Sequence, residues 1–154
     1  MSVIAFIPAR GGSKSIPGKN IKYFCDKPLI FWNLNELQES EVDQIIVATD
    51  SDEIKQIVNS FNLSKVKVFD RGIENSQDFS STESVMLEYI QYADINEDDV
   101  FMLVQATSPF TQSNHFNEGL ELFKNHDSVL SCSVSKNFIS EMFTFAPEQQ
   151  AEII

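Results

Sequence analysis

The sequence lacks the features of several large classes of protein. Its apolar runs are all far shorter than a membrane span, so we expect no transmembrane helix and no membrane partner. Residues 1–3 do not begin the charged and then apolar layout of a signal peptide. Cys25 and Cys132 lie far apart, and His115 and His126 show no ligand spacing, which excludes the common zinc and redox motifs. These absences predict a cytoplasmic protein with structural thiols and surface histidines.

Positive charge is also scarce. The chain has 23 acidic and 11 basic residues, which gives a net charge of −12. It therefore lacks the extended basic surface that DNA or RNA requires, and no nucleic-acid partner is expected. Before residue 28, however, the chain has five basic residues and a single acidic one. That segment therefore carries a net charge of +4, and the remainder carries −16. The five are Arg10, Lys14, Lys19, Lys22 and Lys27. A local positive segment on an acidic protein suits a small polyanion such as a nucleoside triphosphate.

The two common phosphate-binding motifs are absent as well. A Walker A loop has four residues between its glycines and then Lys-Ser or Lys-Thr, whereas here five residues separate Gly12 from Gly18 and Asn20 follows Lys19. The Gly-x-Gly-x-x-Gly pattern of dinucleotide-binding proteins is missing too. What is present is a glycine-rich basic loop at residues 9–20, directly after the apolar run 3–7. Because ligands of open α/β sheets bind beyond the carboxyl ends of buried strands, this loop is predicted to bind phosphate.

Apolar runs and amphipathic segments alternate along the chain. We expect strands at 3–7, 44–49, 66–69, 100–104 and 129–134, and helices at 28–39, 51–61, 80–92 and 114–124. This βαβα order predicts an α/β protein with a doubly wound, mostly parallel sheet and helices on both faces.

Two helix starts are predicted from capping boxes, in which a polar residue precedes a glutamate by three positions. Asp50 with Glu53 forms one box, and Ser80 with Glu83 forms the other. The inward-facing residues of the helix at 80–92 are expected to be Met86, Ile90 and Ala93.

Five short motifs resemble a known family and occur in its order. They are residues 7–14 (Ile-Pro-Ala-Arg-Gly-Gly-Ser-Lys), 19–20 (Lys-Asn), 27–29 (Lys-Pro-Leu), 48–50 (Ala-Thr-Asp) and 105–109 (Gln-Ala-Thr-Ser-Pro). The chain resembles the acylneuraminate cytidylyltransferases, the CMP-sialic acid synthetases and their bacterial relatives that act on similar nine-carbon sugars. The resemblance implies a Rossmann-like fold of the nucleotide-diphospho-sugar transferase type. It also implies transfer of CMP from CTP to a 2-keto acid sugar, with release of pyrophosphate.

The resemblance implies a role for individual residues. Arg10 and Lys19 are similar to the family's triphosphate ligands and are the catalytic candidates, and Gly11 and Gly12 resemble its backbone N–H donors to phosphate. Arg71 follows the third expected strand, where the family has an arginine of the base pocket. The implied nucleotide-binding residues are Ala9, Arg10, Gly11, Gly12, Ser13, Lys14, Lys19, Asn20, Arg71, Ser80, Ser81 and Thr82. The implied sugar-binding residues are Gln105, Thr107 and Ser108.

Several of these residues also have a structural interpretation. Arg71 could be a solvated loop arginine, Ser80 only a helix cap, and Thr107 and Ser108 the caps of a turn before Pro109. The chain also departs from the family pattern at two positions. Gly72 and Ala106 stand where the family usually has proline.

The family further implies Mg²⁺ and a homodimer in the full-length form. Its metal-binding aspartates lie further along than residue 154, so the metal ligands are unknown here. We expect a nucleotide-binding α/β domain at 1–136 and the start of an incomplete dimerisation or distal segment at 137–154, where the apolar pattern loses its period.

Two other functions stay open. One is a related sugar nucleotidyltransferase that uses a different acid sugar. The other is a shortened, non-catalytic chain that binds CTP. No residue in the motifs is an evident general base, and none is assigned.

Overall fold

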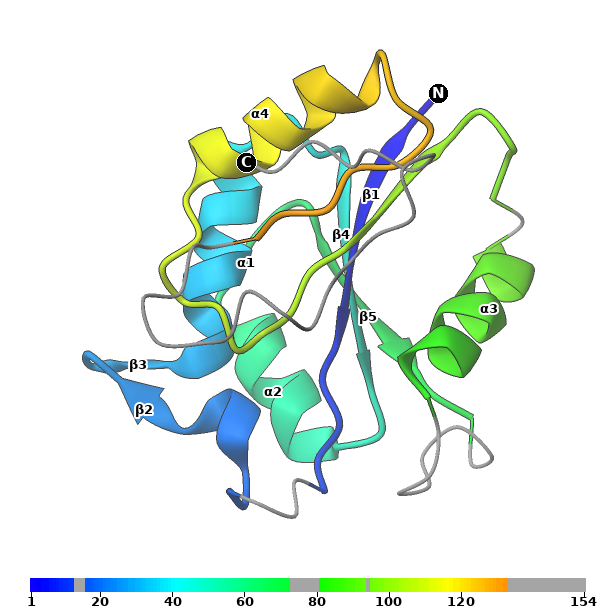
Figure 1. The fold of residues 1–154 in the computed structure, drawn as a ribbon. Helices are drawn as coiled ribbons and strands as arrows, with labels where there is room; N and C mark the ends of the chain where they lie inside the picture. The colour runs from blue at the N-terminus through cyan, green and yellow to red at the C-terminus, as the bar shows by residue number, and fades with distance from the viewer. Residues whose placement is uncertain (13–15, 73–80, 94, 133–154) are drawn as a thin grey trace, which may run out of the picture. The chain divides into compact units, whose positions relative to one another are not determined.

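The central sheet has four parallel strands in the order β5-β4-β1-β6 (Figure 1). The structure is a computed structural model that describes residues 1–12, 16–72, 81–93 and 95–132. The strands are β1 (Val3–Pro8), β4 (Gln44–Thr49), β5 (Val66–Asp70) and β6 (Val100–Leu103). Each lies within one residue of a predicted strand, and the parallel α/β sheet is confirmed.

The strand order places β1 in the middle of the sheet. Ala5 of β1 is paired with Ile45 of β4 on one side and with Met102 of β6 on the other. The chain runs outward from β1 to β4 and β5, and it then returns to add β6 beside β1. Such a reversal opens a crevice at the carboxyl ends of the two strands where the order reverses, here β1 and β6.

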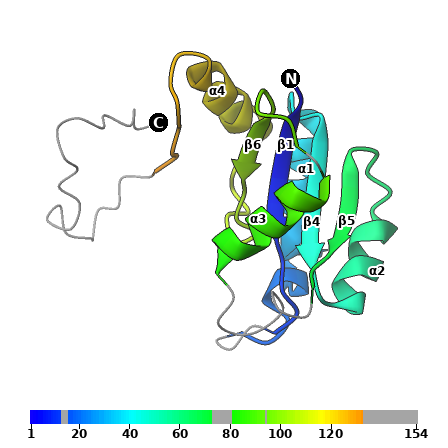
Figure 2. The same ribbon diagram turned by 90° about the vertical axis from the view of Figure 1, so that its right-hand side faces the viewer.

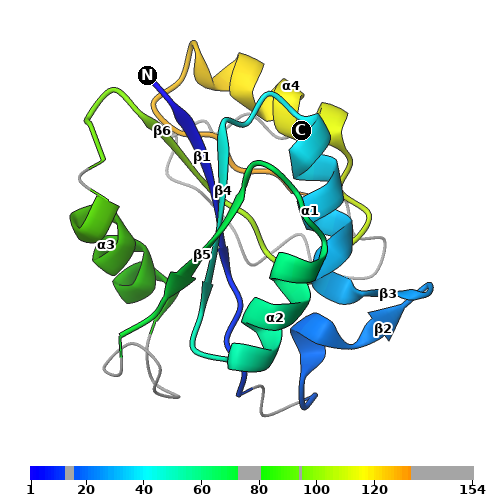
Figure 3. The ribbon, with the colours of Figure 1, turned by 180° about the vertical axis from the view of Figure 1, so that it is seen from behind.

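Helices cover both faces of this sheet, as the doubly wound fold requires. Helices α1 (Leu29–Glu39) and α2 (Asp52–Ser60) lie on one face, and α3 (Thr82–Ala93) lies on the other (Figures 2 and 3). The α1 face buries Ile30, Leu34 and Leu37 completely. Successive strand residues point to opposite faces, so strands with a helix layer on each side are apolar throughout.

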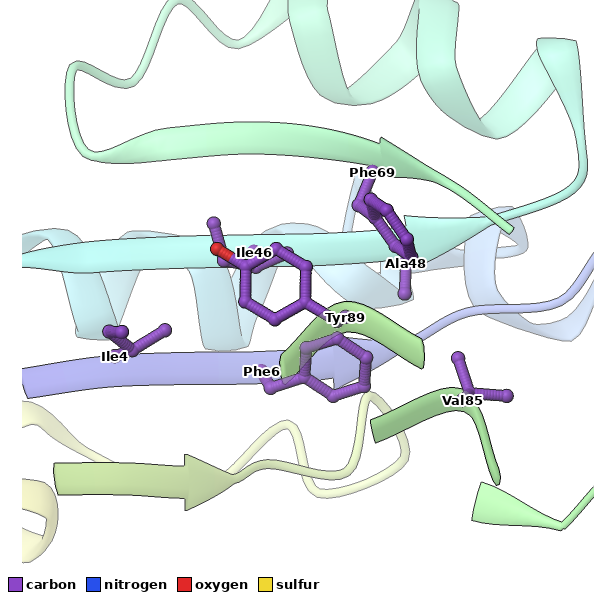
Figure 4. Packing of buried hydrophobic residues seen from close by; sticks show 7 residues of the cluster. All are labelled: Ile4, Phe6, Ile46, Ala48, Phe69, Val85 and Tyr89. Atoms are coloured by element: carbon purple, nitrogen blue, oxygen red, sulfur yellow. The ribbon is translucent and has the colours of Figure 1, made fainter. Parts of the chain in front are cut away.

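The core between the sheet and α3 is rich in aromatic rings (Figure 4). Tyr89 of α3 packs on Phe6 and Phe69, with ring centroids 5.5 and 5.1 Å apart. The predicted inward stripe of α3 was therefore wrong by one position: Val85 and Tyr89 are buried, Met86 and Ile90 are half-buried, and Ala93 is exposed. Both stripes are apolar in the sequence, and the one that contains the large ring faces the sheet.

The cap of α2 differs from the prediction, whereas the box predicted at the start of α3 lies partly outside the described residues. The N-cap of α2 is Ser51, whose Oγ accepts a hydrogen bond from the Ile54 N–H at 3.4 Å. The predicted box of Asp50 and Glu53 was wrong, because the Asp50 carboxylate accepts a bond from another loop. At the start of α3 the Ser84 N–H donates to Ser81 Oγ at 3.1 Å, and Ser80 lies outside the described residues.

A small hairpin between the first loop and α1 was not predicted. Strands β2 (Tyr23–Phe24) and β3 (Lys27–Pro28) are antiparallel and joined by Cys25 and Asp26, whose φ angles are 49° and 64°. Two successive positive φ angles are typical of the two-residue hairpin turn that matches strand twist. The hairpin follows a short 3-10 helix, η1 (Lys19–Ile21).

The chain divides into two compact units, Met1–Ser113 and Asn114–Ile154. Helix α4 (Ser113–Phe123) starts within a residue of its prediction. The strand expected at 129–134 is wrong over its described part, 129–132, which forms no strand. Leu130 is 63% exposed there, whereas a strand of a covered sheet would bury it and would need a neighbouring strand for its hydrogen bonds. The predicted boundary at 136/137 lies outside the described residues.

Among the described helices, none combines the length and the apolar composition that a membrane span needs.

Candidate active site

The candidate site lies at the carboxyl edge of the sheet. All four strands are parallel, so the segments that follow them emerge at one edge (Figure 2). The edge therefore receives residues 9–12 after β1, Asp50 after β4, Arg71 after β5 and residues 104–108 after β6. The fold thus gathers the predicted phosphate loop, base-pocket arginine and sugar-side motif at one edge.

The loop after β1 is attached to the turn after β4. The Ala9 N–H donates to the Ala48 carbonyl at 2.9 Å, which prolongs the β1–β4 pairing. The Gly11 N–H donates to Asp50 Oδ1, also at 2.9 Å. A side chain at Gly11 would place its Cβ only 2.8 Å from Ser51 Cβ, so the two segments are in close contact. Gly11 was expected to offer its N–H to a phosphate, and in this structure that N–H binds Asp50.

Gly12 has a different environment from Gly11. It is exposed, and a Cβ built on it would meet no atom within 4 Å. Its backbone is therefore open to an approaching anion. Ser13 and Lys14, which follow it in the predicted site, lie outside the described residues.

Asn20 supports the same loop from its other end. Its side chain is only 7% exposed, and its Nδ2 donates to the Arg10 carbonyl at 3.2 Å. Gly18, with a φ of 63°, turns the chain into η1 and so brings Asn20 back towards Arg10. Lys19, in the same short helix, is half-buried beside Asn20. The buried amide thus fixes the backbone from which the Arg10 side chain projects.

Arg71 lies close enough to the loop for the charge of Arg10 to act on its guanidinium. Its N–H donates to the Thr49 carbonyl at 3.2 Å, so it continues the edge of β5 beside β4. Burial lowers the pKa of its half-buried guanidinium, Asp50 and Glu88 raise it, and Arg10 lowers it further. Because such effects decline with distance, Arg71 lies in a cluster of charges of both signs that also contains Asp50, Glu88 and Arg10. This environment argues against the solvated-loop interpretation of Arg71.

The motif after β6 forms a turn that is anchored on α1. The Gln105 carbonyl accepts bonds from the Ser108 N–H and from Asn33 Nδ2, both at 3.2 Å. Asn33 is completely buried, and its Oδ1 has no hydrogen-bond partner in the described part of the chain. Gln105, Thr107 and Ser108 are exposed, as residues that contact a ligand would be before it binds.

Two residues of the site were missed by the sequence analysis, and each had a signal. Asp50 comes directly after a buried strand, where ligand-site residues are common. Asn33 interrupts the apolar stripe of α1 between Ile30 and Leu37. A polar residue on a buried stripe needs a partner, so it often marks a structural contact.

The remaining predicted residues lie at the start of α3. Ser81 and Thr82 are exposed, and Ser81 caps the helix. Ser81 therefore has a structural role of its own, and its contact with a nucleotide stays a prediction. Helix α3 is tied to the loop after β5, because the Gly72 N–H donates to Glu88 Oε1 at 2.7 Å.

The described residues do not fit a magnesium ion held by protein ligands. They contain no group of three His, Cys, Asp or Glu side chains that could hold a metal. Asp50 Oδ1 already accepts the Gly11 N–H, and Asp52 is paired with Lys55 at 2.9 Å. Mg²⁺ therefore stays a prediction from resemblance, and no step is derived through it.

The chain is similar in sequence to known cytidylyltransferases. A family model described as cytidylyltransferase matches residues 4–148. N-acylneuraminate cytidylyltransferase B of Danio rerio is 43% identical over 117 residues, covering 76% of this chain and 26% of that protein. The N-acylneuraminate cytidylyltransferase of Streptococcus agalactiae is 32% identical over 156 residues, covering 98% and 37%. The CMP-N,N'-diacetyllegionaminic acid synthase of Legionella pneumophila is 34% identical over 136 residues, covering 86% and 58%.

The structural comparison supports the fold. The structure of CMP:2-keto-3-deoxy-manno-octonic acid synthetase complexed with CTP has a TM-score of 0.69 at 22% identity. It covers 84% of this chain and 50% of that one. The first two sequence relatives are longer still, since the chain spans only about a quarter to a third of their length.

Proposed function

The chain belongs to the cytidylyltransferase family, and on this premise we propose that it transfers CMP from CTP to a nine-carbon 2-keto acid sugar and releases pyrophosphate. Relatives named as acting on N-acylneuraminate and on diacetyllegionaminic acid support this class of sugar. Mg²⁺ dependence, a homodimer of the full-length protein, a cytoplasmic location and the absence of nucleic-acid and membrane partners are part of the proposal.

One observation carries the proposal. The loop after β1 is fixed by Asp50 and Asn20, so that Arg10 and Arg71 share one charge cluster at the carboxyl edge of the sheet. Gly12, two positions after Arg10, has an exposed backbone that an anion can approach, and two guanidinium groups at this edge favour a polyanion such as a triphosphate. Lys19, which lies between Gly18 and Asn20 at the start of η1, would add a third cation.

The reaction requires mainly positioning and charge neutralisation. The anomeric hydroxyl of the sugar attacks the α-phosphorus of CTP and loses its proton to solvent, a new O–P bond forms, and the bond from the α-phosphorus to the bridging oxygen breaks. Pyrophosphate takes the electron pair as it leaves. Arg10 and Lys19 would bind the β- and γ-phosphates and offset the charge that develops on the leaving group. Arg71 would face the nucleotide from β5.

The sugar would bind on the other side of the crevice between β1 and β6. Gln105, Thr107 and Ser108 are exposed on the turn that follows β6, and Asn33 holds this turn on α1. The two substrates would thus approach from adjacent loops, as transfer between them requires.

The alternative of a chain that binds CTP without catalysis is favoured by one observation. The described residues offer no set of protein ligands for a metal. Binding and turnover must therefore be measured separately.

The test is pyrophosphate release with CTP and a panel of acid sugars, including sialic, legionaminic and octulosonic acids. CTP binding by calorimetry is measured in parallel, with ATP, GTP and UTP as controls. The proposal predicts CTP-dependent release that requires a nine-carbon acid. CTP binding without release would support the non-catalytic alternative, and no binding would refute the site.

A further inference from the structure

Asp50 is the residue of the site whose role is unassigned. Its Oδ1 accepts the Gly11 N–H at 2.9 Å, across 39 positions of sequence. We propose that Asp50 is a positioning residue that fixes the root of the phosphate loop and thereby sets CTP affinity. The inference rests on the proposed function for its effect on CTP, whereas the contact itself can be tested without any ligand.

Two independent features direct Gly11 towards the turn between β4 and α2. One is its hydrogen bond to Asp50, and the other is its close packing on Ser51, where a Cβ would come within 2.8 Å. Figure 3 shows the chain leaving β1 beside this turn. The N–H of Gly11 therefore faces the turn between β4 and α2.

The turn that receives Gly11 is itself firmly held. The Ser51 N–H donates to Thr49 Oγ1 at 3.1 Å, and Thr49 is completely buried at the end of β4. Ser51 in turn caps α2 through its contact with Ile54. Because Thr49 and Ser51 on either side of Asp50 are held in place, the Asp50 carboxylate is a fixed acceptor for the Gly11 N–H.

Fixing Gly11 also fixes the neighbouring Arg10. The Arg10 carbonyl accepts a bond from the buried Asn20, so the peptide that joins Arg10 to Gly11 is held at both its carbonyl and its N–H. A pre-ordered loop loses less conformational entropy when it binds a ligand, and this raises affinity. The negative charge of Asp50 also stabilises the charged form of Arg71, which the charge of Arg10 opposes.

A different role for Asp50 would have the opposite effect. If the carboxylate only occupied the place of a phosphate and were displaced by CTP, its removal would tighten binding. In that case the Gly11 N–H would keep its direction and donate to the phosphate in place of the carboxylate, so the sign of the change in CTP affinity separates the two roles.

The experiment uses Asp50→Ala, which removes the acceptor, and Asp50→Asn, which keeps an oxygen acceptor without the charge. Asp52→Asn is the matched control. It removes the same charge two residues further along the chain, from an exposed side chain that is paired with Lys55. The first measurement is hydrogen exchange of the Gly11 amide by NMR, without ligand. We expect protection in the unaltered chain, in Asp52→Asn and in Asp50→Asn, and a loss of about tenfold or more in Asp50→Ala.

The second measurement is CTP affinity by calorimetry, with KM for CTP and for the sugar where turnover is detectable. Asp50→Ala should weaken CTP binding by about tenfold or more, Asp50→Asn should stay within about fivefold of the unaltered chain, and the sugar KM should not change. If Asp50 had a merely structural role, both Asp50 variants would lose stability and their CTP affinities would not differ from each other. Thermal unfolding of both variants is therefore measured as well.

Three results would overturn the proposal. Tighter CTP binding in both Asp50 variants would identify a displaced internal anion. An Asp50→Asn chain with a protected Gly11 amide but the poor affinity of Asp50→Ala would assign the role to charge alone. An unprotected Gly11 amide in the unaltered chain would refute the contact. If no chain binds CTP, the proposed function fails, while the exchange result still decides whether Asp50 holds Gly11.

Discussion

At the scale of single residues, the two adjacent glycines of the phosphate loop have different reasons to be glycine. Gly11 has no room for a side chain, because Ser51 lies within 2.8 Å of where its Cβ would be. Gly12 has open space around it. From the sequence, both glycines were expected to donate to phosphate. The contact between residues 11 and 51 could not be foreseen, because it depends on a strand pairing that no local pattern encodes.

Substitution of the two glycines by alanine should therefore give unequal results. Gly11→Ala should lower the free energy of unfolding by about 1–3 kcal/mol. The new Cβ would clash with the Cβ of Ser51, and neither atom can move aside without a shift of the backbone. Gly12→Ala serves as the control and should cost much less. Chemical denaturation measures both. The double variant Gly11→Ala, Ser51→Gly should recover stability, and equal losses at Gly11 and Gly12 would contradict the packing.

Asn33 is expected to matter more for function than for stability. In Asn33→Leu the bond to the Gln105 carbonyl is lost, but the buried Oδ1 that has no partner among the described residues is removed too. The two effects should leave the free energy of unfolding within about 1 kcal/mol. The sugar KM should rise while CTP affinity stays unchanged. A large loss of stability, or a loss of CTP affinity, would contradict the role given to Asn33.

At the scale of elements, periodicity predicted where strands and helices occur but not how they face. The described strands of the sheet were predicted because buried strands are continuous apolar runs. The stripe of α3 was wrong by one position because Tyr89 has three aromatic neighbours, Phe6, Phe69 and Phe101, which come from three different strands. The hairpin was missed because its positive φ angles fall on Cys25 and Asp26 and not on the usual Asn-Gly or Asp-Gly pair.

The cap of α2 gives a test at this scale. Ser51→Ala should lower the free energy of unfolding by about 0.5–1 kcal/mol, at the low end for an N-cap because the bond to the Ile54 N–H is long, 3.4 Å. Glu53→Ala should have little effect, since the capping box predicted for it does not form. Urea unfolding compares the two. A larger loss in Glu53→Ala than in Ser51→Ala would show that the box forms after all.

At the scale of the whole molecule, charge separation and sheet topology agree on the position of the site. The chain has a net charge of −12, yet its first 28 residues carry the basic loop, and β1 places that loop at the point where the strand order reverses. The sequence alone could predict the loop and its place after a buried strand, and its ligand class stays a prediction. It could not predict the neighbours of the loop, because the contacts of Gly11 with Asp50 and of Asn33 with Gln105 join residues 39 and 72 positions apart.

The most direct test of the central claim is calorimetry of CTP binding to the unaltered chain, to Lys19→Ala and to Lys67→Ala. Lys67 is the matched control, because its Nζ contacts Gln44 on the sheet and its removal changes the net charge equally. The site predicts that Lys19→Ala weakens binding by about 1–3 kcal/mol, roughly 5- to 150-fold, through loss of a charge-assisted hydrogen bond. Lys67→Ala should leave affinity almost unchanged. Equal affinity in Lys19→Ala and the unaltered chain, or an equal loss in both variants, would contradict the assignment of the triphosphate to the loop after β1.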